Sequence, residues 1–286
     1  MAELPPLRDV IARHGLEARK SLGQHFLFDL NLTGRIARAA GDLSVGTVIE
    51  IGPGPGGLTR ALLDAGAARV IAVERDDRAI AIQTEIADAY PGRLEIIGGD
   101  ALAVDAADLG TAPRKIVANL PYNISTVLLL AWLRRAEAFE RMVLMFQKEV
   151  VDRLAAAPRS AEYGRLSVIT QWRCEVHPLF NIDRRAFTPP PAVTSTVVEL
   201  IPRPQPLWPA RFATLERVTA AAFGQRRKML RSSLKALGDA DGLLEATGLP
   251  PTARAEEISV EGFCALAQAL DARAGGRDDP GDNIPG

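Results

Sequence analysis

Short apolar runs rich in β-branched residues alternate with helical patterns between about residues 30 and 200. We expect strands at residues 47–51, 69–74, 94–98, 115–119 and 142–147. After the second of these runs, apolar residues recur at helical spacing behind Asp76 or Asp77, and either acid can cap a helix. The alternation of strands and helices predicts an α/β fold, in which a parallel sheet carries helices on both faces.

Two later apolar runs, residues 174–182 and 193–201, have no helical pattern between them. We therefore expect an antiparallel pair that closes the sheet and is joined through Phe187-Thr188-Pro189-Pro190-Pro191. Several prolines then follow between Pro202 and Pro209, and neither strand nor helix persists through such a run. The sequence predicts a domain boundary at this point.

Beyond the boundary the pattern is helical, at about residues 210–222, 226–236, 243–247 and 260–273. We therefore expect an α/β domain at residues 1–202, a small all-helical domain at 203–274 and a disordered tail at 275–286. The tail is rich in Gly, Pro and Asp, and such a segment cannot bury enough apolar surface to fold.

The composition is typical of a globular protein, with 286 residues, 47% of them hydrophobic and 24% charged, and a mean hydropathy of +0.04. No apolar run approaches the ~20 residues that span a bilayer, so no membrane contact is expected. Residues 1–16 lack the continuous apolar core of a secretory signal, which predicts a cytoplasmic protein. Cys174 and Cys264 lie far apart and the chain has 3 histidines, a pattern that favours neither a disulfide framework nor a metal site.

The formal net charge of −1 conceals an uneven distribution. Between residues 203 and 235 there are eight basic residues and a single acid. Four of the cations stand close together, at Arg226, Arg227, Lys228 and Arg231. We expect these four to bind RNA phosphates. The alternative is an ordinary charged helix face in contact with water.

A glycine-rich turn follows the first predicted strand, in the run Gly52-Pro53-Gly54-Pro55-Gly56-Gly57. Gly52 and Gly54 let the backbone pass close to a ligand, and α/β sheets bind nucleotides at such turns. Glu74 ends the next strand, where a carboxylate can bind ribose hydroxyls. Asp100, followed by Ala101, ends the third strand, where an acid can bind the adenine amine. Taken singly, each feature is also typical of an ordinary turn, strand end or helix cap.

The chemistry of the turn distinguishes between two nucleotide-like ligands. Its two prolines fit poorly a loop that holds pyrophosphate on a helix N-terminus, as a dinucleotide site requires. S-adenosyl-L-methionine has no phosphate and needs only the turn. The sequence therefore favours S-adenosyl-L-methionine over NAD.

The run Asn119-Leu120-Pro121-Tyr122 ends the fourth predicted strand. The amine of adenine is a poor nucleophile because its lone pair is delocalised into the ring. Two acceptors, the Asn119 side-chain carbonyl and the Leu120 backbone carbonyl, can orient this amine toward a methyl donor, while Pro121 fixes the backbone. Tyr122 can stack on one face of the base and Phe187 on the other. The alternative is an ordinary proline-containing turn.

In their order along the chain, these motifs resemble the ribosomal RNA small subunit adenine dimethyltransferase family, the kasugamycin-sensitivity methyltransferases, over about residues 8–272. The matching runs are Lys20-Ser21-Leu22-Gly23-Gln24-His25-Phe26-Leu27, the glycine turn, Gly99-Asp100-Ala101, Asn119-Leu120-Pro121-Tyr122-Asn123-Ile124-Ser125, Gln147-Lys148-Glu149, Phe187-Thr188-Pro189-Pro190-Pro191-Ala192-Val193 and Phe223-Gly224-Gln225-Arg226-Arg227-Lys228. The resemblance implies a Rossmann-like class I methyltransferase sheet with a small C-terminal helical domain.

The resemblance also implies residue roles and a substrate. Cofactor contacts are expected at His25, Leu27, Gly52, Gly54, Glu74, Asp100, Ala101 and Asn119. Many members of the family have Asn in place of His25, and either side chain can donate a hydrogen bond. The family dimethylates the N6 amines of two adjacent adenosines in a hairpin loop near the 3′ end of 16S rRNA, within the small (30S) ribosomal subunit or its precursor. We expect a monomer that takes part in ribosome biogenesis.

Three other functions share some of these features. Erythromycin-resistance methyltransferases, which methylate a large-subunit adenosine, have a similar fold and active motif, but the full Asn119-to-Ser125 run and the long C-terminal domain favour the small-subunit substrate. A non-catalytic assembly factor has no need to keep Glu74, Asp100 and Asn119 together. NAD-dependent oxidoreduction is disfavoured because no proton-relay residue is apparent.

Overall fold

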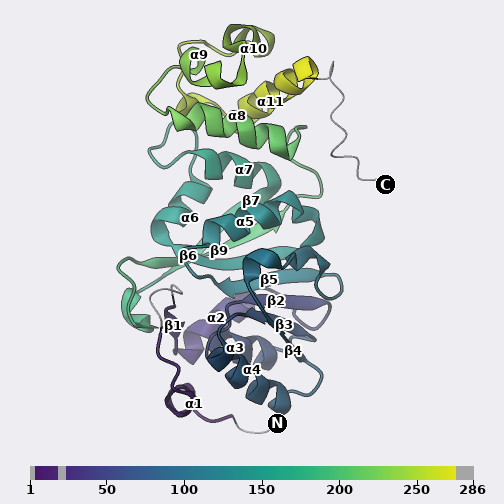
Figure 1. Ribbon diagram of the computed structural model, residues 1–286, viewed down its shortest axis with the longest axis vertical. Helices are drawn as coiled ribbons and strands as arrows, with labels where there is room; N and C mark the ends of the chain where they lie inside the picture. The colour runs from purple at the N-terminus through teal and green to yellow at the C-terminus, as the bar shows by residue number, and fades with distance from the viewer. Residues whose placement is uncertain (1–3, 19–23, 275–286) are drawn as a thin grey trace. The chain divides into compact units, whose positions relative to one another are not determined.

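The computed structural model describes residues 4–18 and 24–274. The Lys20-to-Gly23 part of the first matching motif and the predicted tail at 275–286 lie outside the described residues. Contacts between Cα atoms divide the chain into two compact units, the first made of Met1–Asp152 and Cys174–Pro204 and the second of Arg153–Arg173 and Gln205–Gly286. Figure 1 traces the elements of both units from purple at the N-terminus to yellow at the C-terminus.

The first unit contains a sheet that, within the described residues, has 7 strands in the order β4-β3-β2-β5-β6-β9-β7. Their bounds are β2 Thr47–Ile51, β3 Val70–Glu74, β4 Leu94–Gly98, β5 Arg114–Asn119, β6 Arg141–Gln147, β7 Cys174–Ile182 and β9 Ser195–Pro202. Strands β2 to β6 are mutually parallel, and β9 lies antiparallel between β6 and β7. The predicted parallel sheet and the closing antiparallel pair are therefore confirmed.

Every residue of β2 and β3 is buried, and all of them are apolar except Thr47, Glu50 and Glu74. Helices pack on the sheet because these central strands are apolar on both faces. The helices of the first unit are α1 Leu7–His14, α2 Leu30–Ala39, α3 Gly57–Asp64, α4 Asp77–Ala89 and α5 Ser125–Arg134, and α6 Lys148–Ala155 begins in it. Asp76 caps α4, as predicted, by accepting a hydrogen bond from the Arg78 amide.

A two-stranded sheet lies beside the main one and was not predicted. Its strands, β1 Phe26–Leu27 and β8 Phe187–Thr188, pair antiparallel, with Leu27 opposite Phe187. This pairing brings the segment before α2 against the proline-rich connection between β7 and β9. Short 3-10 turns complete the first unit at η2 Ala101–Ala103, η3 Ala106–Asp108, η4 Ala136–Ala138 and η5 Arg184–Ala186.

The second unit is helical and has its own hydrophobic core. It contains α7 Arg165–Arg173, α8 Phe212–Gly224, α9 Leu230–Ser233, η6 Leu234–Leu237, α10 Ala240–Thr247, η7 Ala255–Glu257 and α11 Val260–Ala274. Residues 153–173 belong to this unit, although we expected them in the α/β domain. The reason is that Tyr163, Val168 and Trp172 are buried in one cluster with Leu215 and Phe263.

The predicted helix at residues 226–236 is wrong over its first part. Residues 225–229 form a turn, and helix α9 begins only at Leu230. Two long-range contacts hold the turn: Met229 forms a backbone bridge with Arg254, and Arg226 forms an ion pair with Glu256. Arg226, Arg227 and Lys228 therefore lie on a turn, and Arg231 lies in helix α9.

Candidate active site

A pocket opens in the first unit at the carboxyl ends of β2, β3, β4 and β5. The sheet order reverses on either side of β2, and α/β sheets bind ligands at such a switch point. The lining includes every residue predicted to contact the cofactor: His25, Leu27, Gly52, Gly54, Glu74, Asp100, Ala101 and Asn119. It also includes Leu120, Pro121 and Tyr122. Residues from successive strand ends therefore meet in one pocket.

The glycine turn forms one wall of this pocket. Gly54 has φ 53° and Gly56 has φ 87°, conformations that residues with a side chain rarely adopt. A Cβ atom at Gly56 would also stand 2.2 Å from Cδ1 of Ile86, so the close packing of the turn on α4 excludes a side chain there. Gly54 itself lines the pocket, and because it has no side chain the wall at this point is backbone alone.

Glu74 is the buried acid of the site, with only 5% of its surface exposed. Its Oε2 accepts a hydrogen bond from the Gly54 amide at 3.1 Å, and its Oε1 accepts from the amides of Arg75 and Asp76 at 2.8 and 2.9 Å. Burial raises the pKa of Glu74, and these amide hydrogen bonds oppose the rise. The contacts fix both carboxylate oxygens, and Oε2, which accepts a single amide, keeps capacity to accept a further hydrogen bond from a ligand hydroxyl.

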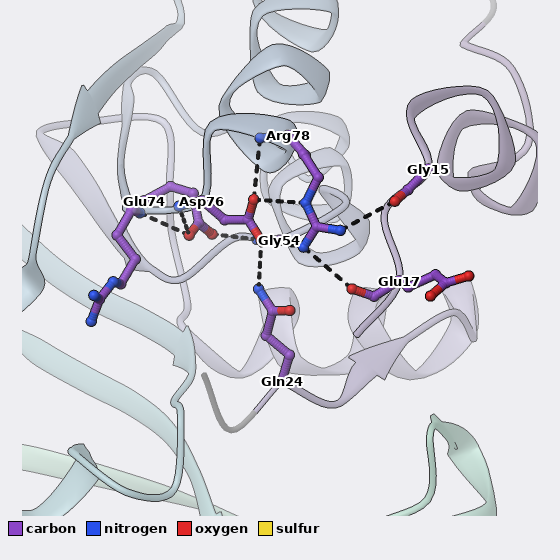
Figure 2. A network of polar contacts seen from close by, with 8 residues as sticks. Gly15, Glu17, Gln24, Gly54, Glu74, Asp76 and Arg78 are labelled. Carbon is purple, nitrogen blue, oxygen red and sulfur yellow. Dashed lines mark hydrogen bonds and ion pairs between the residues drawn. The ribbon is translucent and has the colours of Figure 1, made fainter. Parts of the chain in front are cut away.

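A polar network connects this acid to the N-terminal segment. Asp76 is bound by the Arg78 guanidinium, with an Nη2–Oδ2 distance of 2.7 Å, and by Gln24 Nε2 at 3.2 Å. Figure 2 shows Arg78 reaching from Asp76 to the backbone carbonyls of Gly15, at 3.1 Å, and Glu17, at 3.3 Å. The hydrogen bonds from Arg78 lower the pKa of Asp76 to about 2. Arg78 therefore holds the backbone of the N-terminal segment beside the pocket.

Asp100 lies at the pocket edge and also acts as a cap. Its Oδ1 accepts the Leu102 amide at 3.0 Å, and its Oδ2 lies 3.7 Å from the Arg75 guanidinium. Asp100 therefore caps a 3-10 turn and lines the pocket, and its contact with a ligand stays a prediction. Ala101, the next residue, lines the same edge.

Asn119 is held by a backbone carbonyl from a distant part of the chain. Its Nδ2 donates to the His25 carbonyl oxygen at 3.1 Å. A carbonyl can only accept, so the amide nitrogen must face His25, and Oδ1 is the end left to face a ligand. Pro121 packs near the glycine turn, where its ring carbons would lie 3.6 Å from a Cβ atom at Gly52. The turn after β5 and the glycine turn are therefore neighbours.

Tyr122 is held at both its ring and its hydroxyl. The His25 ring stacks on it with centroids 5.6 Å apart and planes 28° apart, and its Oη lies 2.6 Å from Ser195 Oγ. His25 Nδ1 in turn lies 2.8 Å from the Pro189 carbonyl oxygen, which requires a proton on Nδ1. Burial raises the pKa of Tyr122, so the side chain remains a neutral phenol rather than a base.

Phe187 does not line the pocket, because its ring is buried, and its place over the target base stays a prediction. Its side chain is 1% exposed, packs in the hydrophobic core of the first unit and does not line the pocket. The physical reason is the pairing of β8 with β1, which places Phe187 opposite Leu27 and buries the ring. The Pro189 carbonyl of the proline-rich connection and the Ser195 hydroxyl of β9 instead bind the pocket residues His25 and Tyr122.

Glu50 is a pocket residue that we did not predict. It lies in the middle of β2, is 1% exposed and accepts a hydrogen bond from Thr59 Oγ1 at 2.7 Å. Gln83 Nε2 contacts the same hydroxyl at 3.2 Å and the Gly54 carbonyl at 3.2 Å. Burial raises the pKa of Glu50 to about 8. The available signal was an acid within the otherwise apolar run Val48-Ile49-Glu50-Ile51.

The predicted RNA-binding cations of the second unit differ in their surroundings. Arg226 Nε donates to Glu256 at 2.9 Å, and its Nη2 donates to the Ala161 carbonyl at 2.6 Å. These contacts give Arg226 a structural role in its own unit, and its RNA contact stays a prediction. Arg227, Lys228 and Arg231 are exposed.

Two kinds of feature are absent from the described part of the chain. None of its helices combines the length and apolar character needed to cross a bilayer. No cluster of three or more His, Cys, Asp or Glu side chains among residues 4–18 and 24–274 is arranged to hold a metal ion.

Two solved structures share this arrangement. A dimethyladenosine transferase from Plasmodium falciparum superposes with a TM-score of 0.75 at 26% identity and covers 87% of this chain and 98% of its own. The 23S rRNA methyltransferase ErmE superposes with a TM-score of 0.64 at 28% identity, over 86% of this chain and 99% of its own. The fold and the site define a class I methyltransferase.

The chain belongs to the ribosomal RNA adenine dimethylase family, which matches residues 15–272. A protein of Paramagnetospirillum magneticum named ribosomal RNA small subunit methyltransferase A is 85% identical over 96% of this chain and 97% of its own length. A protein of Rhodospirillum rubrum with the same name is 74% identical over 94% of this chain and 93% of its own length.

Proposed function

We propose that this protein dimethylates the N6 amines of two adjacent adenosines in a hairpin loop near the 3′ end of 16S rRNA, with S-adenosyl-L-methionine as methyl donor. The observation that carries the proposal is the meeting of Glu74, Asp100 and the Asn119-to-Tyr122 turn in one pocket. Family membership and the names of the small-subunit relatives support the choice of substrate.

The pocket fits adenosylmethionine by the chemistry of its donors and acceptors. Glu74 offers a buried carboxylate for the ribose hydroxyls, Asp100 an acceptor for the adenine amine, and Gly54 a wall without a side chain. The prolines at 53 and 55 remove two amides that a pyrophosphate loop would use. When bound, adenosylmethionine supplies an activated methyl group.

The residues of this chain orient the target amine. Asn119 Oδ1 accepts one amine hydrogen, because the amide nitrogen is already bound to the His25 carbonyl. The Leu120 carbonyl accepts the other hydrogen, and together the two acceptors favour a pyramidal nitrogen whose lone pair is available for reaction. Tyr122 stacks on the base, worth about 1–3 kcal/mol by analogy with other base–aromatic contacts. The product ammonium then loses its proton to water.

RNA contacts outside the pocket come from exposed cations. Arg227, Lys228 and Arg231 are exposed, and we infer that they neutralise phosphates of the small-subunit RNA. A hairpin loop suits this chemistry, because a target base must be unstacked before it enters a pocket. The protein acts as a monomer in the cytoplasm, where ribosomal subunits are assembled.

The test is methylation of undermethylated small ribosomal subunits and, in a separate reaction, of large ribosomal subunits, with labelled adenosylmethionine, followed by nucleoside analysis. We expect N6,N6-dimethyladenosine at two adjacent positions of 16S rRNA and none with the Asn119→Ala variant. Label confined to large-subunit RNA would favour the alternative activity, methylation of a large-subunit adenosine. The structural similarity to the 23S rRNA methyltransferase ErmE is the reason to test this alternative. Binding of small subunits without any transfer of label would point to a non-catalytic assembly factor.

A further inference from the structure

Ser195 carries a fully buried hydroxyl. It begins strand β9, is 0% exposed and pairs with Gln147 of β6 on one side and Ile182 of β7 on the other. A hydroxyl at such a position is unfavourable unless it is hydrogen-bonded. The Oη of Tyr122, at 2.6 Å, is the partner that the structure gives it.

Tyr122 lies on a turn, which by itself does not fix its ring, whereas stacking on a base requires a fixed ring face. It follows β5 closely, and 73 positions of chain separate it from Ser195. A ring that is free to rotate loses side-chain entropy when a base stacks on it, whereas a ring already fixed does not. His25 covers one face of the ring, so a single face is left for a base.

The segment from Pro189 to Ser195 holds the stacked pair of His25 and Tyr122, with one contact from each end of the segment. The Pro189 carbonyl binds His25 Nδ1 at 2.8 Å, and the Ser195 hydroxyl binds Tyr122. Strand pairing of β9 with two neighbours fixes the Ser195 backbone. The Tyr122 hydroxyl is therefore bound to a rigid part of the sheet.

We propose that Ser195 is a positioning residue for methyl transfer: its hydroxyl anchors the Tyr122 phenol so that the ring face opposite His25 meets the target adenine. The inference rests on the proposed function, because it takes Tyr122 to stack on that base. It predicts a role in orienting RNA and none in binding adenosylmethionine.

The experiment is a double-mutant cycle with Ser195→Ala, Tyr122→Phe and the combined variant. Either single change removes the same hydrogen bond and keeps the aromatic ring. We expect kcat on undermethylated small subunits to fall about three- to tenfold in each single variant, the range that one hydrogen bond supplies. The double variant should be no slower than the singles, and the Kd for adenosylmethionine should be unchanged in all three.

Thr196→Val is the matched control. Thr196 is the next residue of β9, is also buried and donates a hydrogen bond at 2.7 Å to Oδ1 of Asn181, a side chain outside the pocket lining. Its replacement should lower the melting temperature and leave kcat unchanged. A merely structural Ser195 would behave in the same way.

Two results would overturn the proposal: a Ser195→Ala enzyme with normal kcat, or a double variant whose loss of rate is the product of the two single losses. Should Ser195→Ala fail to fold, Tyr122→Phe still removes the bond from the other side, and normal kcat in that variant likewise overturns the proposal. Tyr122→Ala separates this inference from the proposed function. Full activity in Tyr122→Ala contradicts the base-stacking role itself, whereas an inactive Tyr122→Ala beside a fully active Ser195→Ala contradicts only the anchoring.

Discussion

The side-chain amide of Asn119 donates a hydrogen bond to the backbone carbonyl of His25 at 3.1 Å, across 94 positions of sequence. This contact determines which end of the amide faces the pocket. Because the nitrogen is bound, the oxygen is the end left to face a ligand, as the proposed methyl transfer requires. Hydrogen bonds between distant residues thus decide how the pocket presents its polar atoms.

Replacing Asn119 tests the orientation of the amine directly. We expect Asn119→Ala to keep its fold and to lose methyl transfer by orders of magnitude, because one of the two acceptors is gone. Asn119→Asp is the sharper variant: it keeps an acceptor but sets a carboxylate oxygen against the His25 carbonyl. Single-turnover methylation should be severely reduced in both variants, with circular dichroism as the control for folding. Near-normal turnover in either would refute this role.

Replacing Phe187 tests whether this residue stabilises the hydrophobic core or stacks on the target base. The side chain is 1% exposed, so Phe187→Ala should destabilise the protein by about 3–5 kcal/mol through the cavity it leaves. Phe187→Leu fills most of that space and should cost much less. Denaturant unfolding measures both. A fully stable Phe187→Ala protein with a selective loss of RNA placement would support the stacking role.

Arg78 should influence cofactor affinity without lining the pocket itself. Its guanidinium holds the Gly15 and Glu17 carbonyls beside the site (Figure 2), so Arg78→Ala releases the N-terminal segment that leads to the pocket residues His25 and Leu27. We expect a several-fold rise in the Kd for adenosylmethionine by calorimetry. Arg13→Ala is the control, because Arg13 forms an ion pair with the exposed Glu85 side chain. Equal effects of the two variants would argue against a specific role.

Glu50 should make the stability of the cofactor-free protein depend on pH. Burial raises its pKa from 4.5 to about 8, so the folded state binds this proton more tightly than the unfolded state. Its stabilising contribution is complete below the unfolded pKa and is lost as pH rises through the folded one, with a slope of up to about 1.4 kcal/mol per pH unit. Glu50→Gln removes this titration. Its melting temperature should therefore change less between about pH 5 and 8 than that of the unmodified protein. Parallel curves would contradict the assignment.

Measurements of RNA binding and of thermal stability should distinguish the exposed cations from Arg226. Removal of Arg227, Lys228 or Arg231 should weaken RNA binding and reduce the salt dependence, by about 0.7 in the log–log slope for each phosphate that is no longer neutralised. Arg226→Ala should instead lower thermal stability, because it breaks the ion pair with Glu256. An RNA affinity that stays constant between low and moderate salt would exclude a role for phosphate contacts.

Much of the fold and most of the pocket could be predicted from the sequence by itself. The periodicity of apolar residues predicts the order of strands and helices, and the acid before a helical pattern predicts the Asp76 cap. Gly52, Glu74, Asp100 and Asn119 reach one pocket because parallel strands bring their carboxyl ends to the same edge. These features depend on local pattern and on a general property of α/β sheets.

The tertiary structure alone decided the contacts that join distant segments. The register of β1 on β8 buries Phe187, and a register is not readable from two short runs of residues. The Tyr122–Ser195 bond, the placement of residues 153–173 with the second unit and the ion pair of Arg226 likewise depend on which surfaces meet after folding. Residue types and spacing determine which elements form, whereas side-chain direction and burial are fixed only when those elements pack together.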